Sequence, residues 1–400
     1  YLAIDGDDLW LTGTGDPATG DPAISKANKR TTTSMLDEWA EALKKRGITR
    51  IMGKLIYYDA ALDSEWVHPS WSKSFAGDWY AAPVAGLNFN DNCVDVKVTP
   101  TTDGEPVQYT VVPLTKGAEF FNEATSGGKG DVDIKREPAA NVFKITGSAT
   151  RPTDLSSKSV TDPGAFFADA LRTHLESSGI KIDGPSQRVA KPLGSKLAPP
   201  ISKIVAVHES KMSDVMWRIN KSSQNLFAEA MCKLLGQAWM MKQGRDQPGS
   251  WHAGAEAVRD FLKRNGIDTT YFVIVDGSGL SRDNRVTVRL ICDLLVTMTR
   301  HPHADAFNAS LSIAGKDGTL RNRLKDLPGE SFRGKTGYIG GVRSLSGFVK
   351  TRRGEWLAVS VIYNGFKGSV KPFEELQDEV VRTLINYPSL PAETPARERS

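Results

Sequence analysis

Residues 334–363 read GKTGYIGGVRSLSGFVKTRRGEWLAVSVIY and decide the fold of the chain. Two apolar stretches of strand length occur in it, at residues 344–350 and 355–363, and the turn sequence TRRG separates them. This arrangement predicts a β-hairpin. Helical periodicity surrounds the hairpin, at residues 211–238 with a break near 221–223, at 251–265, at 286–299 and at 373–387. The order of elements predicts an α/β (α+β) layer domain with an antiparallel sheet.

The first half of the chain has a different pattern, of short strands and turns with one amphipathic helix. The helix is predicted at residues 34–46, where Leu36, Trp39 and Leu43 recur at three- and four-residue spacing. The Pro- and Lys-rich sequence KPLGSKLAPP at residues 191–200 is the candidate domain boundary. Strands are predicted at residues 8–12, 51–58, 94–98, 109–112 and, in the second half, 271–275.

Composition excludes several classes of protein. The 400 residues exceed one small domain, and 40% hydrophobic with 24% charged residues is typical of globular chains. A net charge of +4 from 51 basic and 47 acidic residues gives no reason to expect nucleic acid as a partner. No apolar run is long enough for a transmembrane helix. Cys93, Cys232 and Cys292 are far apart and form no CxxC, so they predict small buried residues rather than a zinc or redox site.

Two short motifs could carry chemistry. Lys335, Thr336 and Gly337 stand just before the hairpin strands. An ammonium and a hydroxyl at fixed positions suit a substrate that ends in a carboxylate, and the glycine allows its backbone to approach the strand closely. Ser223 and Asn225 form a Ser-x-Asn sequence at the break between two helical stretches. Ser223 could instead be an N-cap, and a capping turn would present both polar side chains to a cleft.

Further blocks accompany these motifs in a fixed order. They are NKSSQNLFAE at residues 220–229, DGSGLSRDNR at 276–285, AGKDGTLR at 314–321, GKTG at 334–337 and GVRSLSG at 341–347. Together the blocks resemble the penicillin-binding protein 4 type of D-alanyl-D-alanine carboxypeptidase/endopeptidase, a class C low-molecular-mass penicillin-binding protein. Similar landmarks in the first half are GTGDP at residues 13–17, GITRIMG at 47–53 and the stretch from 80 to 92. The resemblance covers nearly the whole chain.

The resemblance implies a transpeptidase/β-lactamase-like catalytic domain with a large β-rich accessory insertion. Residues 1–200 would be the insertion, 201–390 the C-terminal part of the catalytic domain and 391–400 a tail. The family's nucleophile belongs to a Ser-x-x-Lys motif upstream of the insertion, so we expect that serine, the N-terminal part of the catalytic domain and a signal peptide upstream of Tyr1. The formal matches at Ser70 and Ser178 stand in a loop-like stretch and at a helix end, and are not expected to act.

Roles for single residues follow from the same resemblance. Ser223 would relay a proton to the leaving amine, and Asn225 would hydrogen-bond the substrate amide and orient the motif lysine. Lys335 and Thr336 would bind the terminal carboxylate beside Gly337. The backbone N–H of Tyr338 would donate to the oxyanion.

The expected reaction is cleavage of peptidoglycan stem peptides ending in D-Ala-D-Ala through an acyl-enzyme, with β-lactams as inhibitors. No cofactor or metal is expected, and the location would be periplasmic or otherwise extracytoplasmic. This chain without the upstream serine is expected to be inactive.

Two alternatives keep the same fold: an inactive homologue that binds wall peptides, and a β-lactamase or esterase. An α/β-hydrolase is excluded because Gly-x-Ser-x-Gly is absent from the sequence. A metalloenzyme would rest only on His301 and His303, without an HExxH motif.

Overall fold

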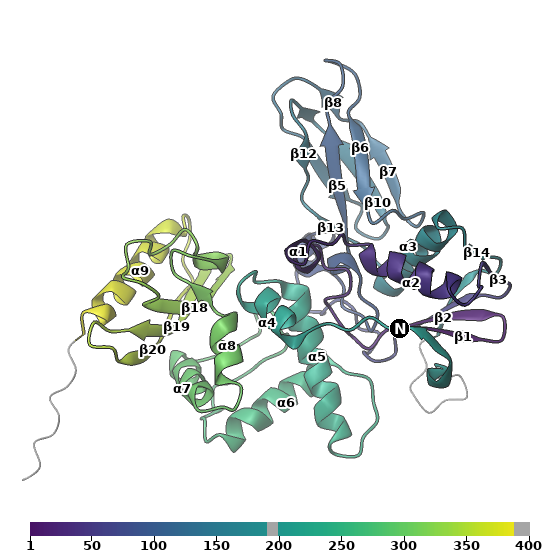
Figure 1. Cartoon of the computed structure of the whole chain (residues 1–400). Helices are drawn as coiled ribbons and strands as arrows, with labels where there is room; N and C mark the ends of the chain where they lie inside the picture. The colour runs from purple at the N-terminus through teal and green to yellow at the C-terminus, as the bar shows by residue number, and fades with distance from the viewer. Residues whose placement is uncertain (190–198, 388–400) are drawn as a thin grey trace, which may run out of the picture. The chain divides into compact units, whose positions relative to one another are not determined.

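The computed structural model describes residues 1–189 and 199–387 and divides the chain into two compact units (Figure 1). The larger unit consists of Tyr1–Val215, Gln224–Arg259 and Val273–Asn284. The smaller unit consists of Met216–Ser223, Asp260–Phe272 and the chain from Arg285 onward. The predicted boundary at 191–200 falls mostly on 190–198 and the predicted tail on 391–400, both outside the described residues, so the division at residue 200 remains a proposal.

A five-stranded sheet of order β15-β4-β2-β1-β16 organises the first part of the larger unit. Its strands are β1 Leu2–Asp5, β2 Asp8–Thr12, β4 Leu55–Tyr58, β15 Ser186–Val189 and β16 Ile204–Ala206. The helices of this part are α1 Pro22–Ala27, α2 Ser34–Lys44 and α3 Pro163–Ser177. Buried Leu36 and Trp39 of α2 share one core with Phe167 of α3, which confirms the predicted amphipathic helix.

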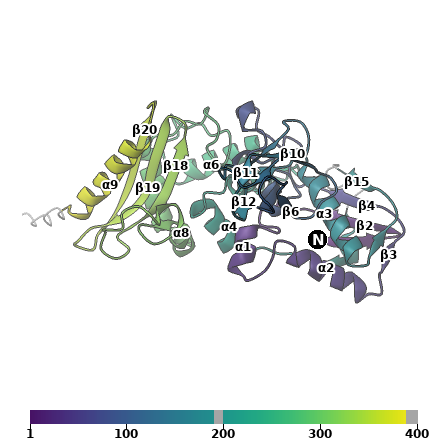
Figure 2. The ribbon, with the colours of Figure 1, turned by 90° about the horizontal axis from the view of Figure 1, so that it is seen from above.

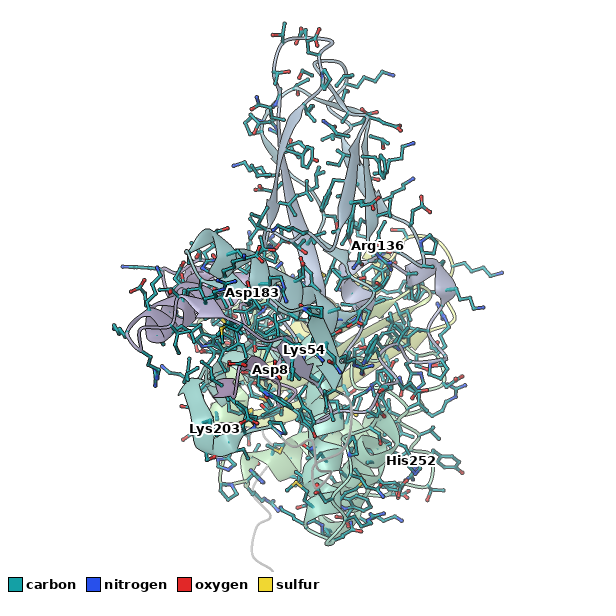
Figure 3. The ribbon with its side chains drawn as sticks, turned by 90° about the vertical axis from the view of Figure 1, so that its right-hand side faces the viewer. Asp8, Lys54, Arg136, Asp183, Lys203 and His252 are labelled. Atoms are coloured by element: carbon teal, nitrogen blue, oxygen red, sulfur yellow. The ribbon has the colours of Figure 1, made fainter. Side chains whose placement is uncertain are left out.

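The strand predicted at residues 51–58 is two strands, because the chain turns sharply at Gly53. A Cβ on Gly53 would lie 2.6 Å from the carbonyl oxygen of Asp7, and the Gly53 amide donates to that oxygen. The Lys54 amide donates to Asp8 Oδ1 at 2.6 Å, and Figure 3 shows both residues at this turn. The preceding piece, β3 Arg50–Ile51, pairs instead with β14 Lys181–Ile182. The prediction for 8–12 is confirmed by β2.

A β-rich region follows in the larger unit, and Figure 1 shows its long strands running beside one another. One sheet contains β5 Cys93–Thr99, β6 Gln108–Val112, β12 Thr153–Asp154 and β13 Lys158–Ser159. A second contains β7 Glu119–Asn122, β9 Asp133–Arg136 and β10 Val142–Thr146, and a third β8 Thr125–Ser126 and β11 Ser148–Ala149. The predicted strands at 94–98 and 109–112 are confirmed.

The smaller unit is built on the sheet β17-β18-β19-β20. Its strands are β17 Ser312–Ile313, β18 Phe332–Ile339, β19 Val342–Lys350 and β20 Trp356–Asn364. Its helices are α7 Val288–Thr299, α8 Ala304–Ser310 and α9 Lys371–Ile385, and α9 lies along the sheet (Figure 2). Leu345 packs in one cluster with Val381 of α9, whereas Phe348 packs with Leu295 of α7. Because side chains alternate along β19, the two helices cover opposite faces.

The predicted hairpin is confirmed by the antiparallel register of β19 and β20, and Gly354 takes the positive φ of 89° that its turn requires. The predicted helices of the second half are confirmed as α4 Met212–Asn220, α5 Asn225–Met241, α6 Trp251–Arg264, α7 and α9. The fold class is therefore α/β (α+β), as predicted. No helix in the described ranges is long and apolar enough to cross a membrane.

The strand predicted at residues 271–275 is wrong. Tyr271 is exposed, and local turns use the backbone, because Asp268 accepts from the Thr270 amide and the Phe272 amide donates to the Thr269 carbonyl. The Val275 amide donates to the Asn284 side chain instead of to a neighbouring strand. Residues 271–275 therefore do not form the strand that the apolar pattern predicted.

Candidate active site

Lys335 lies on β18, where its ammonium group is half-buried among neutral oxygens. Its Nζ donates to Ser223 Oγ at 2.7 Å and to the Thr336 carbonyl at 2.6 Å. Among the described residues no carboxylate forms an ion pair with it. Burial and, to a lesser extent, the nearby Arg343 guanidinium lower the pKa of Lys335 to about 8. No carboxylate in residues 1–189 or 199–387 therefore serves as the counter-ion of this cation.

Ser223 lies in the turn between α4 and α5, and the structure brings it to Lys335 across 112 residues of sequence. Its φ is +57°, a left-handed conformation that residues with a side chain adopt rarely. The alternative role as the N-cap of α5 is wrong, because Gln224 occupies that position and the Ser223 hydroxyl faces Lys335. The turn therefore holds the hydroxyl for a partner outside the helix.

Asn225 is the first residue of α5 and belongs to the larger unit. Its Nδ2 donates to the Tyr80 carbonyl at 2.8 Å, and the neighbouring Gln224 donates to Asp91 Oδ2 at 2.7 Å. These bonds fix the start of α5 against the loop that the sequence blocks at residues 80–92 form.

Thr336, Gly337 and Tyr338 follow Lys335 on the same strand. Thr336 is buried, and its hydroxyl donates to Thr319 Oγ1 at 2.8 Å. A Cβ on Gly337 would lie 2.3 Å from Ser344 Oγ on β19, so the strand pair itself also favours glycine here. The Tyr338 side chain is 65% exposed, which leaves its ring outside the core and is compatible with a role for its backbone alone.

A second polar cluster lies in the larger unit, around Glu229 on α5. Glu229 is fully buried, and its carboxylate accepts from the amides of Gly277 at 2.7 Å and Ser278 at 2.8 Å, and from Trp251 Nε1 at 2.6 Å. Burial and the neighbouring Asp276 raise the pKa of Glu229 to about 7. The cluster joins α5 directly to the DGSG loop.

Asp276 organises the rest of that loop. Its carboxylate accepts from the Gly279 and Ser281 amides and from the Asn284 and Trp71 side chains, at 2.6–3.0 Å. The loop can lie directly against α5 because Gly277 has no Cβ. A Cβ there would come within 2.3 Å of the Ala228 carbonyl oxygen. These bonds make residues 276–284 a closed turn.

Comparison with known proteins decides the family. The model of the D-Ala-D-Ala carboxypeptidase 3 (S13) family matches residues 5–386. The chain belongs to the S13 family. A D-alanyl-D-alanine carboxypeptidase of an Actinomadura species is 31% identical over 400 residues, which cover 95% of this chain and 69% of the relative. The D-alanyl-D-alanine carboxypeptidase DacB of Haemophilus influenzae is 25% identical over 359 residues, 87% of this chain and 71% of the relative.

A solved structure shares the fold. Penicillin-binding protein 4 from Haemophilus influenzae aligns with a TM-score of 0.75 at 24% identity, covering 96% of this chain and 85% of that chain. The resemblance that the motif blocks suggested, to a serine carboxypeptidase family of the penicillin-binding protein 4 type, is thereby confirmed.

Several residues of this S13 chain were not singled out from the sequence. Glu229 stands inside the block NLFAE, where an acidic residue on an apolar helix face was the available signal. Asp317 and Thr319 stand in the block AGKDGTLR, and they contact Lys221 and Thr336. Arg343 faces Tyr338 across the strand pair. Of these contacts, the one between Lys221 and Asp317 joins segments 96 residues apart in sequence.

The cysteines and the rejected serines are placed as follows. Cys93 and Cys232 are buried, as predicted, and Cys292 is half-buried; none of the three forms a disulfide. Ser178 is the C-cap of α3, which confirms the predicted helix end, and Ser70 Oγ bonds with Ser281 Oγ in a loop. In the part of the chain that the structure describes, no group of three or more His, Cys, Asp or Glu side chains could hold a metal ion.

Proposed function

We propose that this chain belongs to a serine-type D-alanyl-D-alanine carboxypeptidase/endopeptidase of the cell wall. The observation that carries the proposal is the Lys335 ammonium, which has no carboxylate partner among the described residues and donates to Ser223 Oγ and to the Thr336 carbonyl. Such a group needs an anion, and a peptide that ends in a carboxylate supplies one. Family membership supports the reaction class.

In the proposed reaction a serine attacks the carbonyl between two D-alanines, the C-terminal D-alanine leaves, and water hydrolyses the acyl-enzyme. Such a serine belongs to a Ser-x-x-Lys motif in the enzymes that the motif blocks resemble. Lys335 and Thr336 hold the terminal carboxylate, which fixes the scissile bond relative to the nucleophile. A pKa of about 8 leaves Lys335 mostly cationic at pH 7, so it can bind that carboxylate.

Ser223 is proposed to pass a proton to the leaving amine. Because its oxygen already accepts from Lys335, its own hydrogen remains available for donation. Asn225 is proposed to bond the substrate amide, Gly337 to admit the substrate backbone and the Tyr338 amide to donate to the oxyanion. No step calls for a cofactor.

We further propose peptidoglycan stem peptides ending in D-Ala-D-Ala as substrates, β-lactams as acylating inhibitors and a periplasmic or otherwise extracytoplasmic location. The Haemophilus influenzae penicillin-binding protein 4 has been solved in complex with a β-lactam, which supports the second of these. A β-lactam mimics the same carboxylate-bearing ligand, so Lys335 and Thr336 would hold it in the same way.

The test uses protein expressed from its complete reading frame and a fluorescent penicillin. Stable labelling of one serine, together with release of D-alanine from a diacyl-L-Lys-D-Ala-D-Ala peptide, is the expected result. Rapid loss of the label with turnover of penicillin would favour the β-lactamase alternative. Wall-peptide binding with neither labelling nor D-alanine release would favour the inactive homologue.

A further inference from the structure

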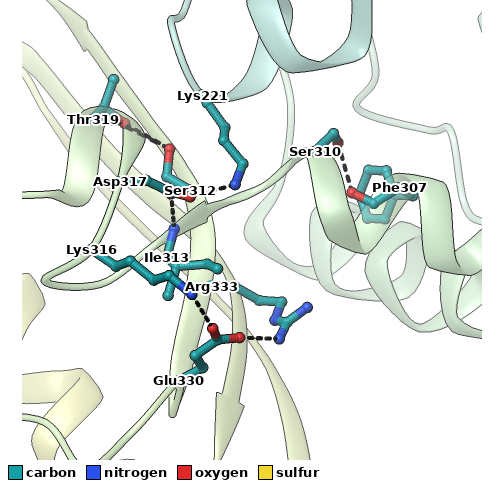
Figure 4. Close-up of polar contacts among 10 residues, drawn as sticks. All are labelled: Lys221, Phe307, Ser310, Ser312, Ile313, Lys316, Asp317, Thr319, Glu330 and Arg333. Carbon is teal, nitrogen blue, oxygen red and sulfur yellow. Dashed lines mark hydrogen bonds and ion pairs between the residues drawn. The ribbon is translucent and has the colours of Figure 1, made fainter. Parts of the chain in front are cut away.

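The turn of Asp317, Gly318 and Thr319 contacts two parts of the candidate site within the smaller unit. Asp317 Oδ2 accepts from Lys221 Nζ at 2.5 Å, and its Oδ1 accepts from the Ile313 amide at 2.8 Å (Figure 4). Thr319 Oγ1 accepts from the Thr336 hydroxyl at 2.8 Å. One short turn therefore touches both the segment that leads into Ser223 and the strand that carries Thr336.

Gly318 allows this turn to lie close to the Ser223 segment. Its φ is +56°, and a Cβ there would lie 2.2 Å from Ser312 Oγ and 3.0 Å from the Lys221 carbonyl oxygen. A side chain at this position would push the turn away from both neighbours. The sequence Asp-Gly-Thr is thus suited to close packing as well as to turning.

Residues 220 and 221, just before Ser223, each form a side-chain contact with another segment. Lys221 pairs with Asp317, and both side chains are largely buried, with 14% and 32% of their surfaces exposed, so the pair is less screened than a surface pair. Asn220 Nδ2 donates to Ser310 Oγ at 2.7 Å. Two side-chain anchors within three residues fix where Ser223 Oγ lies.

The Thr336 hydroxyl must change partner when a carboxylate binds. A hydroxyl has one hydrogen to donate, and the Thr336 hydroxyl donates its hydrogen to Thr319 Oγ1. If Thr336 turns its hydrogen to an incoming carboxylate, the Thr319 hydroxyl can donate to Thr336 in return. That donation polarises the Thr336 O–H and strengthens its bond to the anion.

We propose that Asp317 and Thr319 are positioning residues, which place the Ser223 hydroxyl through Lys221 and make Thr336 selective for ligands that end in a carboxylate. The proposal rests on the proposed function. Thr319 acts on the recognition of one ligand group, whereas Asp317 acts on the proton relay, so the two residues are separable by experiment.

The test for Thr319 compares two acyl donors that share one acyl group, a thioester whose leaving group carries a carboxylate and its methyl ester. Thr319→Val should lower kcat/KM about tenfold for the carboxylate donor and less than about twofold for the neutral donor. Thr319→Ser, which keeps the hydroxyl, should behave like the wild type. Equal loss on both donors, or no loss on either, would overturn the role of Thr319.

The test for Asp317 uses Asp317→Asn, Lys221→Met and the double variant. Each single variant should lower kcat about tenfold on both donors with little change in KM, and the double variant should be no worse than either. Lys316→Met is the matched control, because Lys316 lies beside Asp317 but pairs with Glu330 at the surface. Additive losses, or an equal loss in the control, would contradict the coupling.

A measurement without turnover separates this proposal from the proposed function. If the wild type reacts with neither donor, the proposed function fails. The placement of Ser223 is then tested by urea unfolding of the wild type, Asp317→Asn, Lys221→Met and the double variant. Non-additive midpoints for Asp317 and Lys221 support the anchor, and additive midpoints overturn it.

Discussion

Two buried ionisable groups, Glu229 in the larger unit and Lys335 in the smaller, show how differently burial can be used. In both, loss of water opposes the charged form, which raises the pKa of Glu229 to about 7 and lowers that of Lys335 to about 8. Glu229 accepts from three donors of its own chain and is fully buried. Lys335 is half-buried and meets only neutral oxygens.

The difference teaches which of the two is open to a ligand. The Glu229 carboxylate accepts hydrogen bonds from N–H groups of the same chain. These bonds join α5, α6 and the loop at residues 277–278, so the cluster stabilises the fold. The Lys335 ammonium pairs with no carboxylate among the described residues, and we propose that a ligand supplies the anion. A buried charge with complete internal partners indicates a scaffold, and one without a counter-ion indicates a binding site.

The largest expected effect is on catalysis by Lys335. Lys335→Ala should lower the rate of acylation by penicillin about 10³-fold, on the scale typical of removing a group that holds a substrate charge. Lys367→Ala, at an exposed position, removes the same charge and should leave the rate unchanged. Stopped-flow labelling with fluorescent penicillin measures both. An unaltered rate in Lys335→Ala would mean that the Lys335 ammonium does not bind the carboxylate of penicillin.

The next largest effect is on stability and concerns Glu229. Glu229→Ala leaves three N–H donors without their acceptor, one buried and two part-buried, and should lower the free energy of unfolding by about 3 kcal/mol. Urea unfolding followed by tryptophan fluorescence reports it, because Trp251 belongs to the cluster. Glu41→Ala on the exposed face of α2 should change the value by less than about 0.5 kcal/mol. Equal effects at both positions would show that the cluster is not a scaffold.

The raised pKa of Glu229 gives a smaller, pH-dependent effect. Between pH 7 and about 4.5 the folded protein takes up a proton at Glu229 while the unfolded chain remains ionised there, so this group stabilises the fold increasingly as the pH falls. Relative to Glu229→Gln, the wild type should gain about 2 kcal/mol between pH 7.5 and 5. Unfolding curves at several pH values measure the difference. A difference that shrinks toward pH 5 would mean that the charge is not opposed by burial.

The smallest expected effect concerns the strain at Ser223. A residue with a Cβ at a φ of +57° is strained by about 1 kcal/mol relative to glycine. Ser223→Gly should therefore be about 1 kcal/mol more stable than Ser223→Ala, although both lose the hydroxyl and the activity alike. Parallel thermal unfolding of the two variants tests this. Equal stability would mean that the turn relaxes and does not hold Ser223 in place.

Much of the fold and part of the site were predictable from local patterns. The hairpin at residues 344–363 and the helix break before Ser223 follow from periodicity and turn residues, which act over a few neighbours. The strand expected at 271–275 failed because Asn284, nine residues from Val275, supplied the hydrogen bond that a strand neighbour would have given. An apolar run does not specify which groups accept the hydrogen bonds of its backbone amides.

The sequence by itself determined the family, the order of elements and the residues Ser223, Asn225 and Lys335, because motif spacing and side-chain chemistry are written locally. Only the tertiary structure decided that Lys335 meets Ser223 across 112 residues and that Glu229 meets the Ser278 amide across 49. Such contacts depend on how the chain packs, and packing also sets the burial that shifts each pKa. The path of the chain through space therefore separated a scaffold charge from a binding charge.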